Sequence, residues 1–219
     1  MGRLSKIPPW LGPGAGLLLV FVAAFGCGST GPDDESGGPE SPIGYLVRFA
    51  TAYTMQDSTA YAALLDSAYV FEKLPAGGEP ADLAAALDRA EELRVAGNMF
   101  EKREDPDGRS LRDIDLRFIL KGSAIDETAY PGKPEGETWI RIVAFTDLLV
   151  VVNDPSDPRG FFPVTVASDQ YFVVRRDAVS GRFVTMRQID RPSPGADAGA
   201  VPNEAETASW TGVKEFFGW

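Results

Sequence analysis

The chain has 219 residues, with 32 acidic and 21 basic side chains and no histidine, which gives a net charge of −11. Binding to phosphate backbones depends on clustered Lys and Arg, so nucleic acid is not an expected partner. The lack of histidine excludes histidine-activated nucleophiles and histidine-ligated metals, and we expect neither a metal nor a cofactor. Cys27 is the sole cysteine, so no disulfide can form within the chain.

Residues 1–26 are predicted to be a signal peptide. Arg3 and Lys6 make the start basic, residues 17–25 form an apolar run, and small side chains stand close before Cys27. A transmembrane helix is not expected, because a span needs about twenty consecutive apolar residues and prolines and glycines interrupt everything before residue 17.

Residues 24–27, Ala-Phe-Gly-Cys, resemble the lipobox of bacterial lipoproteins, in which the cysteine is acylated and becomes the new N-terminus. The resemblance implies a lipidated Cys27, a membrane partner reached through that lipid, and a place in the bacterial cell envelope, at the outer membrane or facing the periplasm. The alternative is an ordinary secretory signal with an unmodified Cys27. Residues 27–42 are rich in Gly, Pro, Ser and acids and are predicted to be a flexible tether.

Residues 43–219 have the length and apolar content of a single domain, and helices are expected first. Ser41 as N-cap and Pro42 at the first helical position predict a helix that reaches Thr54. Asp57 or Ser58 can cap a second, shorter helix. A third helix is predicted to start at Pro80 and to stop near Gly97-Asn98, with its inward side chains at Leu83, Leu87, Ala90 and Leu93.

Strands are expected after the helices, preceded by a short one at residues 69–71. Apolar residues alternate over 114–120, and the run 138–152 is apolar on both faces, which favours a central strand. Residues 171–176 and 182–189, joined by a turn, predict a hairpin. Residues 191–208 are expected to form a loop, and 209–219 a short C-terminal helix. The order predicts an α+β fold with three N-terminal helices on a strongly curved, mainly antiparallel sheet.

Three stretches carry a family resemblance: Tyr45–Asp57, Tyr61–Asp66 and Ala68–Glu72. They resemble the opening of the NTF2-like (SnoaL-like, cystatin-like) superfamily, in which two helices are followed by the first strand. Asn98-Met99-Phe100, the hairpin that contains Phe172–Asp177, and Trp210–Lys214 resemble members that occur as bacterial lipoproteins. The resemblance implies a cone-shaped domain whose mouth can hold a small apolar ligand, in a superfamily of enzymes, binding modules and adaptors.

The resemblance also allows an enzymatic alternative. In ketosteroid isomerase and in the SnoaL-type cyclases, a carboxylate base follows the first strand, and the matching position here is Glu72. The tyrosine that stabilises the oxyanion in those enzymes is matched by Phe49, which has no hydroxyl. Tyr53, one turn later, is the replacement donor. The alternative is therefore a cofactor-free isomerase or cyclase with Glu72 as general base, and an exposed Glu72 beside Lys73 is the plainer interpretation.

The predicted function is a lipid-anchored, extracytoplasmic, non-catalytic module that binds a small apolar ligand or a protein partner. Arg141, in an apolar strand, is either a ligand contact inside the cone or a residue of the sheet face paired with an acid. A filled cone is the alternative, in which case strand 138–152 serves a homodimer through the sheet. The residues predicted to line the cone are Phe49, Tyr53, Phe71, Met99, Phe100, Trp139, Arg141, Phe145, Tyr171 and Met186.

Overall fold

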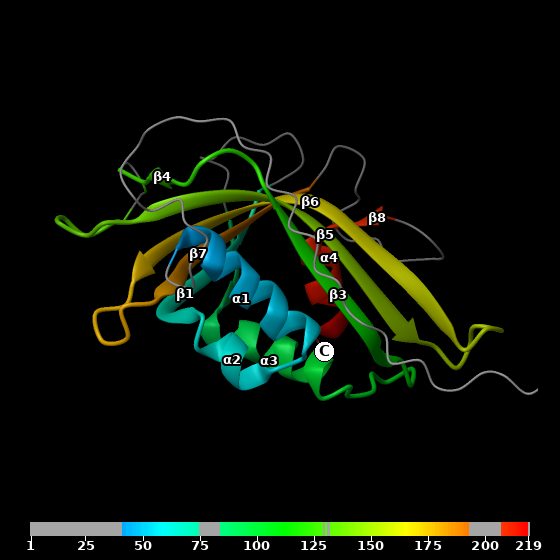
Figure 1. Cartoon of the computed structure of the whole chain (residues 1–219). Coiled ribbons are helices and arrows are strands. Elements are labelled where there is room, and N and C mark those ends of the chain that lie inside the picture. Colours follow the sequence, from blue (N-terminus) through cyan, green and yellow to red (C-terminus); the bar gives the residue numbers. More distant parts are fainter. Residues whose placement is uncertain (1–40, 75–83, 129, 131, 193–206, 219) are drawn as a thin grey trace, which may run out of the picture. The chain divides into compact units, whose positions relative to one another are not determined.

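The computed structural model describes residues 41–74, 84–128, 130, 132–192 and 207–218. They form an α+β domain in which helices pack against one side of a single bent sheet, as the sequence predicts (Figure 1). The helices are α1 (Pro42–Thr54), α2 (Ser58–Ala62), α3 (Arg89–Phe100) and α4 (Trp210–Phe217). The strands are β1 (Leu65–Lys73), β2 (Ala84–Asp88), β3 (Ser110–Leu120), β4 (Ile125–Asp126), β5 (Ile140–Asn153), β6 (Phe161–Arg176), β7 (Phe183–Pro192) and β8 (Thr207–Ala208).

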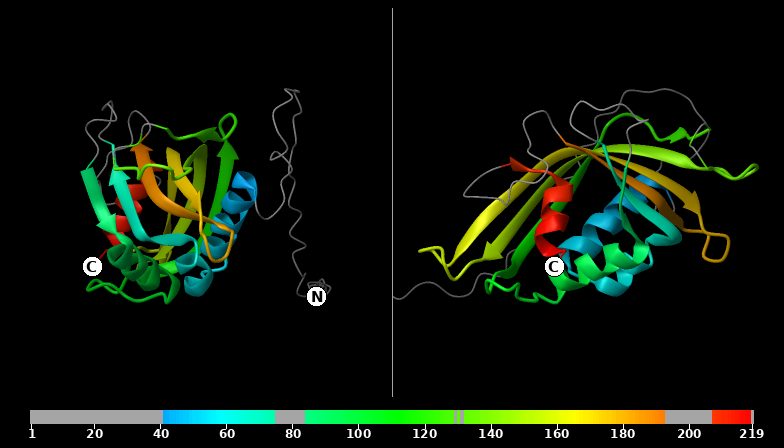
Figure 2. Two further views of the ribbon diagram at one scale, coloured as in Figure 1. Left: turned by 90° about the vertical axis from the view of Figure 1, so that its left-hand side faces the viewer. Right: turned by 180° about the vertical axis from the view of Figure 1, so that it is seen from behind.

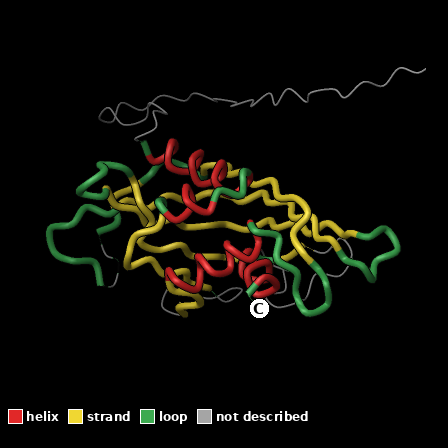
Figure 3. The backbone as a smooth tube through the Cα atoms, turned by 90° about the horizontal axis from the view of Figure 1, so that it is seen from below, coloured by secondary structure: helices red, strands yellow, loops and turns green. Residues whose placement is uncertain are grey.

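The sheet runs in the order β2-β1-β7-β6-β5-β3, with β4 paired to β5 and β8 to β6. Neighbouring strands are antiparallel except in the pairs β1–β7 and β6–β8, so the mainly antiparallel sheet is confirmed. Register shifts interrupt several of these pairings, and bulges of this kind increase the local bend of a strand. All four helices lie on the concave side of the arch (Figures 2 and 3).

The first two helices begin as the sequence predicts. The hydroxyl of Ser41 accepts a hydrogen bond from the backbone nitrogen of Gly44 at 3.0 Å, with Pro42 in the first turn. The carboxylate of Asp57 caps α2 by accepting from the backbone nitrogen of Ala60 at 2.9 Å. Both caps use side-chain oxygens to satisfy amides that have no partner within the helix, which is why the two boundaries can be read from the sequence.

The third helix differs from its prediction. The expected start at Pro80 and the inward Leu83 lie outside the described residues, and Leu87 belongs to strand β2. The helix begins after Asp88, whose carboxylate accepts from the amide of Glu91 while the Glu91 side chain accepts from the amide of Asp88. This reciprocal capping box is the stronger start signal. The helix also continues through Gly97-Asn98 to Phe100.

Several strands and the loop near the C-terminus also differ from their predicted bounds. Strand β1 starts at Leu65, and β6 starts ten residues before the predicted position at 171. Pro163 and the polar residues 168–170 interrupt the apolar alternation in β6, although its backbone pairs with β5 from Phe161 to Val174. Strand β7 extends to Pro192, and Thr207–Ala208 form β8, so the ends of the predicted 191–208 loop are strand; residues 193–206 lie outside the described part.

Burial divides the sheet into an inner face, toward the helices, and an outer face. On β5 and β6 the even-numbered side chains, from Ile142 to Val152 and from Phe162 to Val174, point inward and are buried. They join aromatic residues of α1 and α4 in the main core. A second, smaller cluster on the outer face contains Trp139, Val173 and Met186, with Tyr130 packed against it. The domain therefore has one large interior and a small outer cluster.

Candidate functional site

The residues predicted to line the cone fall on both faces of the sheet. The inner group packs in the main core and is buried: Phe49, Tyr53, Phe71, Met99 and Phe100. The outer group lies on the opposite face, because side chains alternate along each strand and Val173 and Met186 belong to the outer cluster. This group comprises Trp139, Arg141, Phe145, Tyr171 and Met186. The structure therefore brings five of the ten residues together inside the arch and places the other five outside it.

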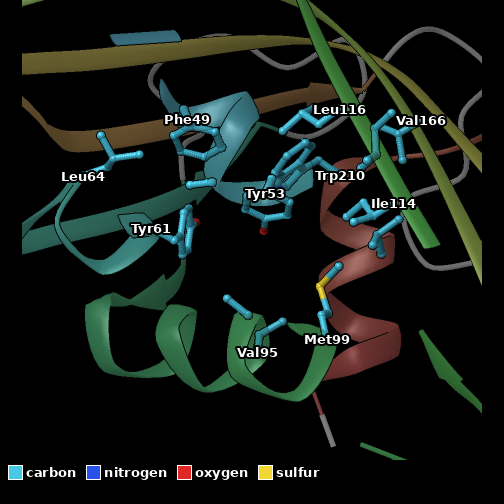
Figure 4. Close-up of a cluster of buried hydrophobic side chains, with 14 of the residues drawn as sticks. Phe49, Tyr53, Tyr61, Leu64, Val95, Met99, Ile114, Leu116, Val166 and Trp210 are labelled. Atoms are coloured by element: carbon cyan, nitrogen blue, oxygen red, sulfur yellow. The ribbon is translucent and has the colours of Figure 1, made fainter. Parts of the chain in front are cut away.

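The inner aromatic residues pack on one another. The ring centroids of Phe49 and Tyr53 lie 5.6 Å apart with the rings stacked, and Trp210 lies 5.2 Å from Tyr53 (Figure 4). The gap between α4 and strands β5 and β6 has no space for a water-sized molecule, and its lining residues are Val150, Val152, Val164, Val213, Phe216 and Phe217. Sites for small molecules generally measure roughly 300–1,000 Å³. These inner side chains therefore fill the described interior instead of lining an open cavity.

Glu72 and Tyr53 do not share a site. Strand β1 directs Phe71 into the core, so the neighbouring Glu72 side chain is on the outer face, where its carboxylate accepts a hydrogen bond from the hydroxyl of Tyr130. Burial, followed by this hydrogen bond, raises the pKa of Tyr130. Tyr53 is buried inside the arch. A base and an oxyanion donor must reach the same substrate, and these two side chains are separated by the sheet.

Arg141 is a residue of the sheet face. Its guanidinium forms an ion pair with Glu127 at 3.3 Å, and its neighbour across the strand pair is Val173 of the outer cluster. Of the two interpretations that the sequence leaves open, the ion pair with an acid is the one observed.

The interior holds a charged pair that sequence reasoning missed. Glu92 of α3 and Lys214 of α4 are almost entirely removed from solvent, and Lys214 Nζ lies 2.6 Å from Glu92 Oε2. The hydroxyl of Tyr61 donates to the other carboxylate oxygen at 2.5 Å. The ammonium also lies 3.6 Å from the centroid of the Phe71 ring, which is a cation–π distance. Burial lowers the pKa of Lys214, and the charge of Glu92 opposes that shift.

A row of buried polar side chains runs from β1 across the inner face of the sheet to α4. Tyr69 donates to Gln188 Oε1 at 3.0 Å, Gln188 donates to Gln170 Oε1 at 3.2 Å, and Gln170 donates to Asp190 Oδ1 at 2.5 Å. Asp190 Oδ2 then accepts from the backbone nitrogen and the hydroxyl of Thr211, at 2.8 and 2.7 Å. Together with Glu92, Lys214 and Tyr61 these residues are called the interior network.

One sequence signal could have revealed the network. Trp210, Lys214 and Phe217 are spaced by four and three residues, so they share one face of a helix, and that face is the buried one. A lysine at the centre of an apolar helix face needs a buried acid as partner. The sequence gives no means of choosing Glu92 as that acid, because the partner is 122 residues away along the chain.

The network can hold an ammonium group and fix the position of α4. Within the described ranges no group of three or more acidic or cysteine side chains is arranged to hold a metal ion. Each carboxylate oxygen of Glu92 and Asp190 accepts a hydrogen bond from another protein group. In this arrangement the two acids act as acceptors within the protein.

Comparisons by sequence give no match, either to a protein-family model or to a curated protein. Comparison with solved structures does give matches. A ketosteroid isomerase-like protein from Erwinia carotovora atroseptica is 18% identical, with 68% of this chain and 91% of that chain covered and a TM-score of 0.42. ActVI-ORFA from Streptomyces coelicolor is also 18% identical, covering 69% and 94%, with a TM-score of 0.41. An NTF2-like protein from Shewanella oneidensis is 13% identical, covering 68% and 94%, with a TM-score of 0.39.

These likenesses concern the fold alone. The helices on the concave side of a bent, open, mixed sheet confirm the α+β architecture that the sequence predicted. The likenesses say nothing of a reaction or a ligand of this chain.

We expect single substitutions in the buried pair to lower the free energy of unfolding more than the double substitution does. Glu92→Gln or Lys214→Met leaves one buried charge without its partner, and breaking such a pair costs about 3–5 kcal/mol. Glu92→Gln combined with Lys214→Met removes both charges, so much of the loss is recovered. Urea unfolding followed by circular dichroism measures all three. Lys73→Met is the matched control, because its 3.6 Å pair with Glu215 is partly exposed and is expected to contribute about 0–1 kcal/mol. Additive losses in the double variant would contradict the coupling.

We also expect a loss of stability in alkali. Burial, and for three of them the charge of Glu92, raises the pKa values of Tyr45, Tyr53, Tyr61 and Tyr69 above the ordinary value of 10.0. The unfolded chain therefore releases these protons first, so stability falls as the pH rises above 10. Phenolate absorbance followed against pH, beside circular dichroism, is expected to show these four tyrosines, together with Tyr130, ionising above pH 10 as the chain unfolds. Ionisation of all tyrosines near pH 10 in a folded chain is the opposing outcome.

Proposed function

We propose that this chain is a lipid-anchored, extracytoplasmic NTF2-like module that acts by binding a small apolar ligand or a protein partner, without a covalent step. One observation carries the proposal: the interior of the arch is packed with side chains, and its acids are engaged by other protein groups. A general acid or base must contact its substrate, and Glu92 and Asp190 are fully buried.

The enzymatic alternative has less support. An isomerase or cyclase with Glu72 as base needs an oxyanion donor near that carboxylate, and Tyr53 lies on the other side of the sheet. Phe49 stacks on Tyr53, lies tilted against Tyr45, and supplies only packing. A binding role makes no such demand on Glu72.

The sequence supports a lipid anchor at Cys27. The signal-like residues 1–26, Cys27 and the predicted tether up to residue 40 lie outside the described residues, whereas Ser41 and Pro42, at the end of the predicted tether, already begin α1. No helix within the described part is long and apolar enough to cross a membrane. A diacylated cysteine with a further acyl chain supplies more than one lipid chain, and two or more suffice for stable attachment.

The outer face of the sheet is the surface that suits a protein partner. Leu149 of β5 is 40% exposed, Ile119 of the neighbouring β3 is 59% exposed, and Phe145 is the residue of β5 directly opposite Ile119. A homodimer through strand β5 would cover these side chains. A small apolar ligand, in contrast, enters the interior only if a packed element moves.

Lipidation is tested by substitution at Cys27. The full chain expressed in a bacterium that processes lipoproteins is expected to appear in the membrane fraction, with a mass that places diacylglycerol on Cys27 as the first residue. Cys27→Ala is expected to abolish both the lipid and the membrane association, while Ser29→Ala, two residues away, retains them. An unlipidated chain that starts near residue 27 would establish the ordinary secretory signal instead.

Binding is tested on the processed chain by native mass spectrometry with solvent extraction. The expected result is a co-purifying apolar compound or a defined complex, either a homodimer or a complex with another protein. Leu149→Lys and Ile119→Lys are expected to shift a homodimer to monomer because they place charge in the interface, whereas Val179→Lys, on an exposed turn, is the control. A monomer free of ligand and partner, together with turnover lost on Glu72→Gln, would overturn the proposal in favour of the enzyme.

A further inference from the structure

Helix α1 has an exposed face that is apolar along its whole length. Ile43 is 38% exposed, Val47 is 58% exposed, and Met55, the C-cap residue, is 72% exposed. Together with Thr51 these residues follow one another at intervals of four, so they form one row along the helix, about 18 Å long. The hydroxyl of Thr51 donates to the carbonyl of Val47 at 2.7 Å, so its polar atom is already bonded within the helix. These four residues are called the α1 row.

The composition of α1 is unusual for a helix with one side in water. A surface helix normally presents charged side chains to solvent, but the only charged residue within Pro42–Thr54 is Arg48. The opposite face packs into the main core through Tyr45 and Phe49. A helix that is apolar on both sides has a second surface that is suited to a partner.

The α1 row begins where the predicted tether ends. Ser41 caps α1, and Ile43 lies in its first turn (Figure 1). Residues 28–40 separate Cys27 from Ser41, and a chain of that length and composition has an average end-to-end distance of roughly 20 Å. A lipid on Cys27 therefore keeps the first turn of α1 within reach of the bilayer surface.

The charges near the α1 row suit a lipid surface better than those of the sheet do. Anionic headgroups repel carboxylates and attract cations, and α1 contains Arg48 and no acid. The nearest acid along the chain, Asp57, is engaged in capping α2. On the outer face of the sheet, in contrast, the exposed Asp147 lies two residues from Phe145, the neighbour of Ile119. Of the two exposed apolar surfaces, the α1 row is therefore the one that fits a bilayer.

We propose that the α1 row lies on the lipid bilayer to which Cys27 is attached, with α1 parallel to the membrane surface. Helices that bind in this way bury their apolar face roughly 5–10 Å into the boundary between headgroups and acyl chains. The inference adds a second membrane contact to the proposed lipid anchor and rests on that anchor. It leaves the outer face of the sheet free for a protein partner.

The test measures the depth of single labelled positions in the lipidated full chain, reconstituted in vesicles of phosphatidylcholine and phosphatidylglycerol. The lipid consumes the thiol of Cys27, the sole cysteine, so Val47→Cys offers one site for a bimane fluorophore. Doxyl groups on the acyl chains are expected to quench this label roughly threefold, because the row is buried at the headgroup boundary. Ile119→Cys is the matched control: its native side chain is 59% exposed, against 58% for Val47, and its label is expected to stay unquenched.

Three outcomes would overturn the proposal. Equal quenching at positions 47 and 119 would mean that the domain has no fixed orientation on the vesicle. No quenching at position 47 would leave the row in water. A blue-shifted emission at position 47 without quenching by the doxyl lipids would place a protein, such as a second copy of this chain, on the row.

Val47→Asp supplies a second variant. The native side chain is more than half exposed, so the fold is expected to be kept, and circular dichroism checks this. A carboxylate resists leaving water, so the quenching of a label at Met55→Cys is expected to fall roughly threefold, while the lipid keeps the chain on the vesicle. Val179→Asp adds the same charge at a side chain that is 96% exposed and is expected to leave the quenching unchanged. Unchanged quenching in Val47→Asp would refute the contact.

The two proposals are distinguished by the order of the measurements. The intact mass, taken before reconstitution, reports the lipid, so an unlipidated Cys27 refutes the anchor, and the α1 contact with it, before any label is read. A lipidated chain that sediments with the vesicles while position 47 stays in water keeps the anchor and refutes only the contact.

Discussion

The ion pair between Lys214 and Glu92 constrains much of what surrounds it. Removing two charges from water costs several kcal/mol for each ion, and only close, well-oriented partners compensate for that cost. The 2.6 Å contact therefore sets α4 against α3 in one register. Tyr61 and Phe71 occupy the positions that the pair requires, one donating to the carboxylate and the other facing the ammonium. The aromatic core of α1 then packs against Trp210, which α4 brings with it.

Local chemistry explains which parts of the fold the sequence could predict. α1 and α2 each start at a capping side chain that accepts from a backbone amide three residues later, so Ser41 and Asp57 indicate these starts in the sequence. Strand β2 and the start of α3 were missed because the leucine and alanine pattern before Asp88 fits a helix as well as a strand. The true boundary is the capping box of Asp88 and Glu91. The predicted strand 171–176 is shorter than β6 because inward-facing Ser168 and Gln170 look like surface residues until their buried partners are known.

The candidate site could be predicted less well, for a physical reason. Alternation along a strand shows which residues share a face but not which face is inside, and the bulge in β7 opposite Val173 and Val174 shifts the alternation midway. Met186 was therefore grouped with Phe71, although the two point to opposite sides of the sheet. Phe49, by contrast, lies inside as the resemblance implies. The network itself joins residues more than a hundred positions apart, and no local spacing encodes such a pairing.

An interior of this polarity needs a reason, because uncharged side chains of similar volume would pack at least as stably. One reason is specificity: a short helix with only apolar side chains could dock in several registers, whereas Lys214 and Thr211 have matching acceptors in one register alone. The sheet holds these acceptors in turn: Gln170 donates to the second oxygen of Asp190, Gln188 donates to Gln170, and Tyr69 donates to Gln188. Because each buried polar group in the row has a partner, the row adds stability where a half-satisfied network would cost it. The glutamines and Tyr69 therefore belong to the same device, since they keep Asp190 in the orientation that Thr211 requires.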